Sequence, residues 1–238
     1  MVNVAVPFMA PYELSFTGRI SMQRLNMGSL GTRLDDEDEP ETPAKPDEAG
    51  SKDAGSQNEL ESRLLRGRKV MVFGQINDKL ARDVVARLLT LAEESDKPID
   101  VYVNSPGGHV ESGDSIHDTI KFIRDDVPVR MIGTGWVASA GALIYLSGLK
   151  SQRVCFPNTR FLLHQPMGGV QGRATDIDIE AREIIKMRER LSQIIAAETG
   201  QAIERVRRDT ERNYWIGAAE AIDYGLVSRI VTTRRELE

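Results

Sequence analysis

The chain has 238 residues, with 31 lysines and arginines against 36 aspartates and glutamates, and it contains one cysteine. The apolar share of 40% and the charged share of 28% are typical of a soluble globular protein, and the length is ample for a hydrophobic core. The lone Cys155 excludes an internal disulfide and so a stapled secreted scaffold, while the net charge of −5 disfavours a nucleic-acid binder.

The first quarter of the chain differs in composition from the rest. Residues 1–58 hold 10 acidic and 5 basic side chains, whereas residues 59–238 hold 26 of each. The acidic run and the proline, glycine and serine residues that follow it cannot bury enough apolar surface to offset their ordering entropy. We therefore expect a mostly disordered tail over 1–58 and one folded domain over 59–238. The apolar first residues lack a basic segment before them, so no secretory signal is expected.

From residue 60 onward, short apolar runs alternate with longer amphipathic runs. Strands are predicted at 70–73, 99–103, 129–132, 154–156, 160–163 and 226–231. Helices are predicted at 78–92, 110–123, 138–149, 175–199, 203–209 and 218–224. The longest helix is expected to begin with a capping box from Thr175 to Asp178 and to end at Gly200. This alternation predicts an α/β domain with a largely parallel sheet.

The uncharged stretch 131–149 has the length of a membrane span. It contains four glycines, two serines and a threonine, and a strand-like half precedes a helix-like half. We interpret it as a buried strand–turn–helix, so no membrane association is expected.

Three segments carry residues suited to chemistry. Asn104-Ser-Pro-Gly-Gly108 follows a strand, and its glycines allow a turn that presents N–H groups to an oxyanion or a bound peptide; an ordinary strand–helix turn is the alternative. Ser139 lies among small residues where a strand becomes a helix, which favours a nucleophile at a helix N-terminus; close helix–sheet packing is the alternative. His164 ends an apolar strand, which suits a general base or a structural histidine.

Two further histidines are weaker candidates. His109 follows the double glycine, and His117 falls on a charged helix face, where we interpret it as solvated. The spacing of histidine, cysteine and carboxylate residues resembles no zinc site, so no metal is expected.

Taken jointly, the motifs resemble the signatures of ClpP, the proteolytic subunit of the Clp protease. The matching segments follow the family order within roughly 62–231, and they are 104–108, 135–142, 164–169, 176–181, 210–213 and 220–226. The resemblance implies a crotonase-like (ClpP-type) α/β fold with a protruding handle helix. It also implies a Ser-His-Asp serine peptidase that cleaves unfolded polypeptides inside a closed chamber.

The resemblance further implies an assembly of two stacked heptameric rings. An AAA+ unfoldase of the ClpX or ClpA type would feed substrate into it, and the ATP would belong to that partner, so no cofactor is expected in this chain. A cytoplasmic location is implied, with neither nucleic acid nor membrane as a partner. Residues 167–173 and the long helix would join the rings, with an apolar seam at Ile177, Ile184 and Leu191.

Carried over residue by residue, the resemblance makes Ser139 the nucleophile and His164 the general base. The backbone N–H groups of Gly108 and Ala140 would form the oxyanion hole. A strand beginning at His109–Val110 and the segment Pro166–Met167 would pair with the main chain of an extended peptide.

Asn213 departs from the family pattern, because the third catalytic residue of the family is an aspartate. An aspartate orients the base and stabilises its imidazolium, and the same exchange in trypsin costs about 10⁴ in kcat. An amide oxygen can still accept from the ring Nδ1–H, so orientation would survive while charge stabilisation would not. Asp209 and Glu211 are near in sequence and are candidates for compensation. A second departure is the tail, which is longer than the family's axial-gate segment.

Three functions therefore stand beside one another. The leading one is the proteolytic subunit, and the second is a weakly active or inactive paralogue that assembles with an active subunit. The third is an acyl-CoA enzyme on the same fold, which would have no use for a Ser–His pair. Reaction with a serine-directed phosphonate separates the first from the other two.

Overall fold

The computed structural model describes residues 59–169 and 171–237, and these belong to one compact unit. The tail expected over 1–58 lies outside the described residues. The strands are β1 (Lys69–Phe73), β2 (Ile99–Ser105), β3 (Val129–Ala138), β4 (Arg153–Cys155), β5 (Arg160–Leu163), β6 (Tyr214–Gly217) and β7 (Arg229–Ile230). The helices are α2 (Asp78–Glu94), α3 (Val110–Ile123), α4 (Ala140–Leu146), α5 (Ala174–Thr199), α6 (Ile203–Asp209) and α7 (Ala218–Tyr224), with short 3-10 turns η1 (Lys150–Gln152) and η2 (Arg234–Leu237).

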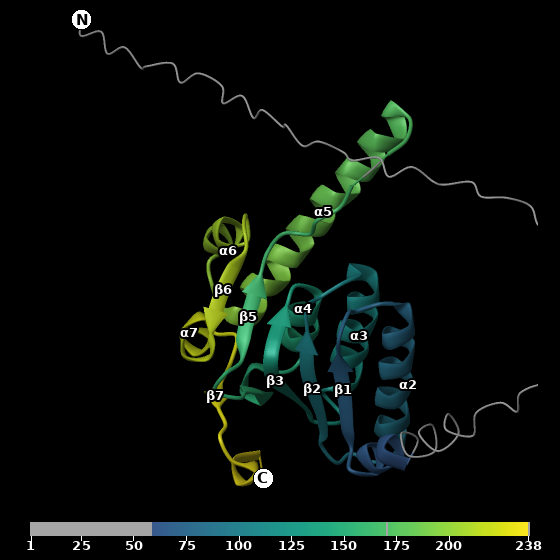
Figure 1. Ribbon diagram of the computed structural model, residues 1–238, viewed down its shortest axis with the longest axis vertical. Coiled ribbons are helices and arrows are strands. Elements are labelled where there is room, and N and C mark those ends of the chain that lie inside the picture. Colours follow the sequence, from purple (N-terminus) through teal and green to yellow (C-terminus); the bar gives the residue numbers. More distant parts are fainter. Residues whose placement is uncertain (1–58, 170, 238) are drawn as a thin grey trace, which may run out of the picture. The chain divides into compact units, whose positions relative to one another are not determined.

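The strands form one sheet in the order β1-β2-β3-β4-β7, with β5 beside β3 and β6 beside β5 (Figure 1). Only β6 runs antiparallel to its neighbour among the strands of the described chain. The largely parallel sheet predicted from the sequence is therefore confirmed.

Strand β3 is longer than the predicted strand at 129–132, because a bulge divides it into two paired halves. Its first half pairs with β4 and its second half with β5, and the β2–β3 register shifts between Val103 and Ser105. Gly135 makes the bend at φ 59°, and a Cβ there would lie 2.9 Å from Asn104 Oδ1. The bulge requires this glycine and turns β3 toward β5.

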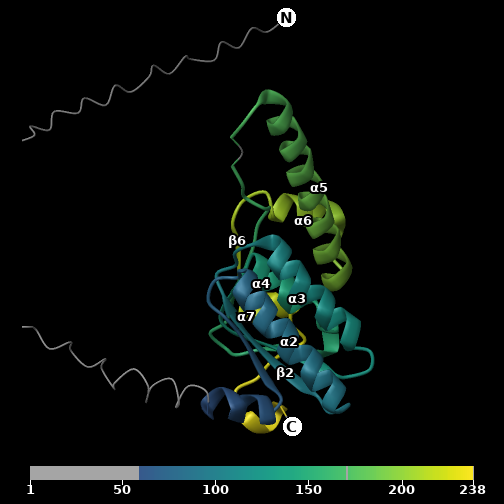
Figure 2. The same ribbon diagram turned by 90° about the vertical axis from the view of Figure 1, so that its right-hand side faces the viewer.

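Helices α2, α3 and α4 lie side by side and pack successively against one another (Figure 2). These helices pack because each has an apolar face. In α2 the apolar residues recur every three or four positions and form its buried face, namely Ala81, Val84, Leu88 and Leu91. Fully burying a valine or leucine side chain contributes roughly 1.5–3 kcal/mol. Helix α4 is buried along its whole length, as the strand–turn–helix interpretation of 131–149 predicts. No helix in the described part of the chain is long and apolar enough to cross a membrane.

Strand β6 was not predicted from the sequence, and the last strand is shorter than predicted. Strand β6 has four residues, too few to show a clear period of two. The strand expected over 226–231 is reduced to β7, because the amides of Leu226 and Val227 both donate to the Ala221 carbonyl at the end of α7. Residues 226 and 227 were predicted to be extended, but through these two bonds they cap the C-terminus of α7 just after Gly225.

Helix α5 extends away from the sheet, and only its C-terminal half is anchored (Figure 1). Its buried residues are Ser192, Ile195 and Thr199, and it ends at Gly200 as predicted. Arg153, which is fully buried, donates to the Glu198 carbonyl, and a cation near a helix C-terminus is stabilising. The predicted capping box is wrong, because the helix begins at 174 and Arg173 caps it without a side-chain hydrogen bond.

Candidate active site

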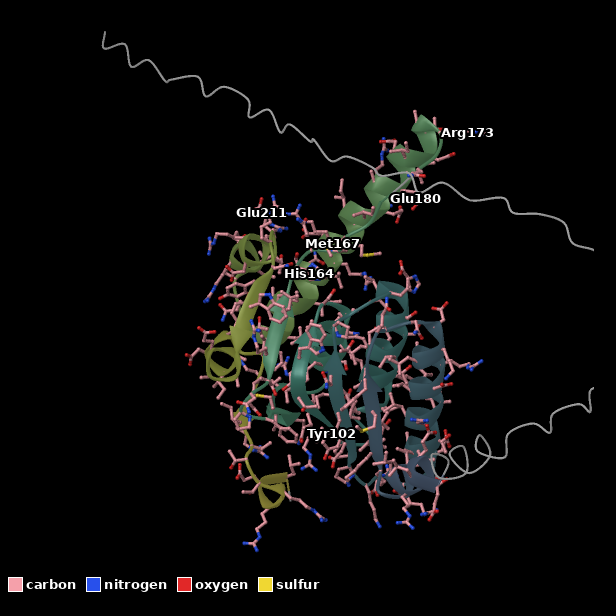
Figure 3. All side chains as sticks on the ribbon, viewed as in Figure 1. Tyr102, His164, Met167, Arg173, Glu180 and Glu211 are labelled. Carbon is pink, nitrogen blue, oxygen red and sulfur yellow. The ribbon has the colours of Figure 1, made fainter. Side chains whose placement is uncertain are left out.

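The predicted chemical residues follow the carboxyl ends of three adjacent strands. Strand β2 ends before the Pro-Gly-Gly turn, β3 ends before Ser139, and β5 ends before His164. Because β2, β3 and β5 are parallel, these ends meet at one edge of the sheet. Figure 3 shows His164 and Met167 at this edge, near the base of α5, and Tyr102 toward the opposite edge.

Ser139 has a backbone conformation that only glycine adopts freely. Its φ of 55° and ψ of −122° fall in the turn between β3 and α4, and Arg68 is the other non-glycine residue with positive φ in the described ranges. The Ser139 amide donates to the Leu162 carbonyl, and its carbonyl accepts from the amides of Ala142 and Leu143. These bonds maintain a backbone conformation of Ser139 that costs about 1–3 kcal/mol. They also place its side chain at the start of α4.

Two backbone amides beside Ser139 are free to bind an anion. Ile76 donates to the Gly107 carbonyl at 2.9 Å and accepts from the His109 amide at 3.0 Å, which leaves the Gly108 amide between two fixed groups. Neither the Gly108 nor the Ala140 amide donates a hydrogen bond to any described residue. Unpaired backbone N–H groups are the kind of donor that an oxyanion hole uses.

Gly107, which the sequence indicated only as part of the glycine turn, closely approaches Ser139. A Cβ at Gly107 would lie 2.6 Å from Ser139 Cβ and 3.1 Å from its Oγ. A Cβ at Gly108 would lie 2.2 Å from the Ile76 carbonyl oxygen. The double glycine in the sequence was the signal for this close approach. A side chain at either position would clash with these neighbouring atoms.

His164 is half-buried, and desolvation lowers the pKa of its imidazole. The ring is therefore neutral at neutral pH, as a general base must be. His164 and Ser139 line one cavity whose other walls are mostly apolar, namely Val110, Ala140, Ala142, Leu143, Leu163, Pro166, Leu191 and Ile195. No hydrogen bond joins the Ser139 hydroxyl to the His164 ring in the described chain, which is common for catalytic pairs without substrate.

Asn213 and His164 lie at the same end of the β5–β6 ladder. The last ladder pair is Leu163 with Tyr214, and His164 follows the first of these residues while Asn213 precedes the second. Asn213 is exposed and His164 is half-buried. The third predicted residue is therefore near the base along the chain fold, and its role beside His164 stays a prediction.

Of the two carboxylates proposed for compensation, that of Asp209 is held by other residues. Asp209 accepts a hydrogen bond from the Tyr224 hydroxyl at 3.2 Å and pairs with Arg205 at 3.4 Å. Glu211 receives the Gln165 side-chain amide on its backbone carbonyl. Within the described residues, neither carboxylate forms a hydrogen bond or ion pair with His164.

The predicted strand at His109–Val110 is wrong. Val110 begins helix α3 with His109 as its N-cap, and the His109 amide and carbonyl are already bonded to Ile76 and Gly113. Both residues nevertheless face Pro166 and Met167 across a hollow that the side of α5 completes. Met167 is 82% exposed there, so it is accessible to solvent beside this hollow.

His117 is buried, not solvated as predicted, since its side chain is 5% exposed and its Nδ1 lies 3.0 Å from Asp118 Oδ1. It faces the protein interior from α3, so the charged sequence around it was misleading. The described residues contain no group of three histidine, cysteine or carboxylate side chains that could hold a metal ion.

Comparison with known proteins connects this site to one family. The family model described as Clp protease matches residues 51–234. The ATP-dependent Clp protease proteolytic subunit 2 of Gluconobacter oxydans is 66% identical over 208 residues, which cover 87% of this chain and 93% of that protein. The protein of the same name in Pseudomonas aeruginosa is 52% identical over 196 residues, covering 82% and 96%.

A solved structure shares the fold. It is a ClpP1 mutant from Listeria monocytogenes in which an asparagine is replaced by aspartate. The match has a TM-score of 0.70 and 48% sequence identity, and it covers 75% of this chain and 99% of that one.

Proposed function

This chain belongs to the Clp protease family, and from that premise we propose that Ser139 and His164 are its nucleophile and general base. It is a proteolytic subunit of an ATP-dependent Clp protease, a serine peptidase with the ClpP-type, crotonase-like fold. Members of this family work as oligomers with a Clp ATPase. The observation that carries the residue assignment is the single cavity lined by strained Ser139 and half-buried His164.

The chemistry follows from this geometry. Ser139 Oγ attacks the carbonyl carbon of a peptide bond while His164 accepts its proton. The Gly108 and Ala140 amides donate to the oxygen that becomes negative. The tetrahedral intermediate then expels the amine, which takes the proton from His164. Water, deprotonated by the same ring, hydrolyses the ester on Ser139 and restores the enzyme.

Asn213 has a limited role in this scheme. Its amide oxygen can orient the His164 ring by accepting from Nδ1–H, but it carries no charge to stabilise the imidazolium. This favours the second candidate function, a weakly active paralogue that assembles with an active subunit. Copurification of a second, differently sized proteolytic subunit in rings of constant composition would support that candidate.

We further propose two stacked heptameric rings served by an unfoldase of the ClpX or ClpA type, acting on unfolded polypeptides in the cytoplasm. The chain itself would need no cofactor or metal. Support comes from the exposed apolar side chains of the handle region, which a monomer would leave in water: Met167, Ile177, Ile179 and Ile185. Native mass measurement tests the stoichiometry, and a monodisperse monomer or dimer would contradict it.

A serine-directed phosphonate tests the nucleophile. It should label the wild-type protein and leave Ser139→Ala unlabelled. His164→Ala should lose peptide turnover while retaining the wild-type thermal unfolding profile. Equal labelling of the wild type and Ser139→Ala would refute the assignment.

A further inference from the structure

Ser105 is a buried polar residue to which the proposed chemistry gives no role. It is the last residue of β2, it pairs with Val137 of β3, and its exposed fraction is zero. Its Oγ accepts a hydrogen bond from the Gly107 amide at 3.0 Å. A serine that bonds the amide two residues later fixes the turn between them.

This bond adds a third restraint to the turn over residues 105–109, which carries the proposed oxyanion donor. The Gly107 amide is held by Ser105, and the Gly107 carbonyl and His109 amide are held by Ile76. The Gly108 N–H belongs to the same planar peptide group as the Gly107 carbonyl, so the bond from Ile76 to that carbonyl fixes its direction. The Ser105 bond restrains the preceding peptide group, which carries the Gly107 N–H.

Ser105 also touches the helix that supplies the second donor. A Cβ at Gly141 would lie 3.0 Å from Ser105 Cβ and 3.4 Å from its Oγ, so the first turn of α4 packs directly on this side chain. Ala140, whose amide is the other donor, precedes Gly141 in that turn. One small side chain thus lies between the loop of Gly108 and the helix start of Ala140.

We propose that Ser105 is a positioning residue that holds the Gly108 amide in register with the Ala140 amide for transition-state binding. The proposal rests on the proposed function of Ser139 and these two donors. Without Oγ, the Gly107 amide loses its buried partner, and the turn through Gly107 and Gly108, at φ 98° and 150°, keeps its two bonds to Ile76 but loses the restraint on its first peptide group. Loss of one oxyanion donor costs about 10²–10³ in kcat, so a misdirected donor should cost roughly 10–100-fold.

The test compares Ser105→Ala with Ser147→Ala in the assembled full-length protein. Ser147 is a matched control, because it is equally buried and its Oγ bonds a carbonyl at the far end of α4. The readouts are kcat and KM for a short fluorogenic peptide, and the inhibition constant of a peptide boronate, whose adduct with Ser139 places an oxygen between the two donors. Ser105→Ala should lower kcat 10–100-fold, weaken the boronate in proportion and change KM less than threefold. Ser147→Ala should lower the melting temperature and leave kcat and boronate binding unchanged.

Ser105→Cys extends the test if Ser105→Ala does not assemble. A thiol fits the site and accepts hydrogen bonds weakly, so kcat and boronate affinity should fall together by a smaller factor. Wild-type kcat and boronate affinity in an assembled variant of either kind would overturn the proposal. Failure of the phosphonate to label Ser139 in the wild type would instead overturn the proposed function, so the two failures are distinguishable.

Discussion

Two residues carry the proposed chemistry of this chain, and each makes a different demand on the fold. Hydrogen bonds to its amide and carbonyl hold Ser139 in a strained backbone conformation. This strain lowers the free energy of unfolding and places the Ser139 side chain at the start of α4. His164 is partly desolvated and has no charged partner among the described residues, so its imidazolium is poorly stabilised. We propose that a carboxylate at position 213 would supply the missing charge.

The strain at Ser139 predicts that Ser139→Gly is more stable than Ser139→Ala, although both are inactive. Glycine relieves about 1–3 kcal/mol of backbone strain, whereas its extra freedom in the unfolded chain costs about 0.4–1 kcal/mol. The strain relief is the larger effect, so we expect a net gain of about 1 kcal/mol. Chemical denaturation of the two variants measures the difference, and equal stability would show that Ser139 is not strained.

Asn213→Asp should raise peptide turnover, because a carboxylate beside His164 stabilises its imidazolium. The trypsin comparison sets the ceiling at about 10⁴, or ~5.5 kcal/mol of transition-state stabilisation. The exposed position and screening by water make a smaller gain the expectation. The measurement is kcat with the oligomeric mass checked in parallel, since a new carboxylate beside Arg212 could perturb assembly. The prediction is falsified if the assembly is intact and kcat does not rise.

The pH dependence of activity should report His164 directly. Burial lowers the pKa of its ring, so the acidic limb of kcat/KM should lie below the ordinary histidine value of about 6.5. In Asn213→Asp the added carboxylate favours the charged ring, so that limb should move to higher pH. The free energy of unfolding should also depend on this pKa. As pH falls, the imidazole of His164 takes up a proton in the unfolded chain, near pH ~6.5, before it does so in the folded chain. Its contribution to the free energy of unfolding is therefore lost as pH drops from about 6.5 through the lowered pKa. A limb unchanged between the two proteins would exclude His164 as the titrating base.

At the scale of elements, the sequence predicted most of what positions the site. The strand before Asn104, the small-residue turn at Ser139 and the apolar strand before His164 all lie where expected, because runs bounded by glycine and proline leave little choice. The roles of Gly107 and Ser105 could not be predicted, since they depend on contacts with β3 and α4 that no local pattern encodes. Strand β6 was missed for the same reason, because pairing with β5 defines it.

At the scale of the molecule, the proposed active site and the proposed association surface share one helix. The anchored half of α5 contributes Leu191 and Ile195 to the cavity of Ser139 and His164, while its outer half exposes Ile177, Ile179 and Ile185. Contacts made by the outer half would therefore lie on the same continuous helix that lines the cavity.

Substitution on the outer half of α5 tests the association surface. Ile185→Asn should reduce the assembled mass and the peptide turnover together, because it removes exposed apolar area without touching the subunit core. Arg188→Asn, one turn away and also exposed, is the matched control that leaves apolar area intact. The unfolding free energy of the isolated subunit should change by less than about 0.5 kcal/mol in both. Unchanged assembly in Ile185→Asn would remove this residue from the interface.

The one-sided anchoring of α5 implies a gradient of backbone protection along a single helix. In an isolated subunit, amides over 174–187 should exchange with deuterium through local fraying, because no side chain in that span is fully buried. Amides near Ser192, Ile195 and Thr199 should exchange only when the subunit unfolds. Assembly should slow exchange in the first span and leave the second nearly unchanged. The position along α5 at which exchange slows would then mark, residue by residue, how far the neighbouring subunit reaches.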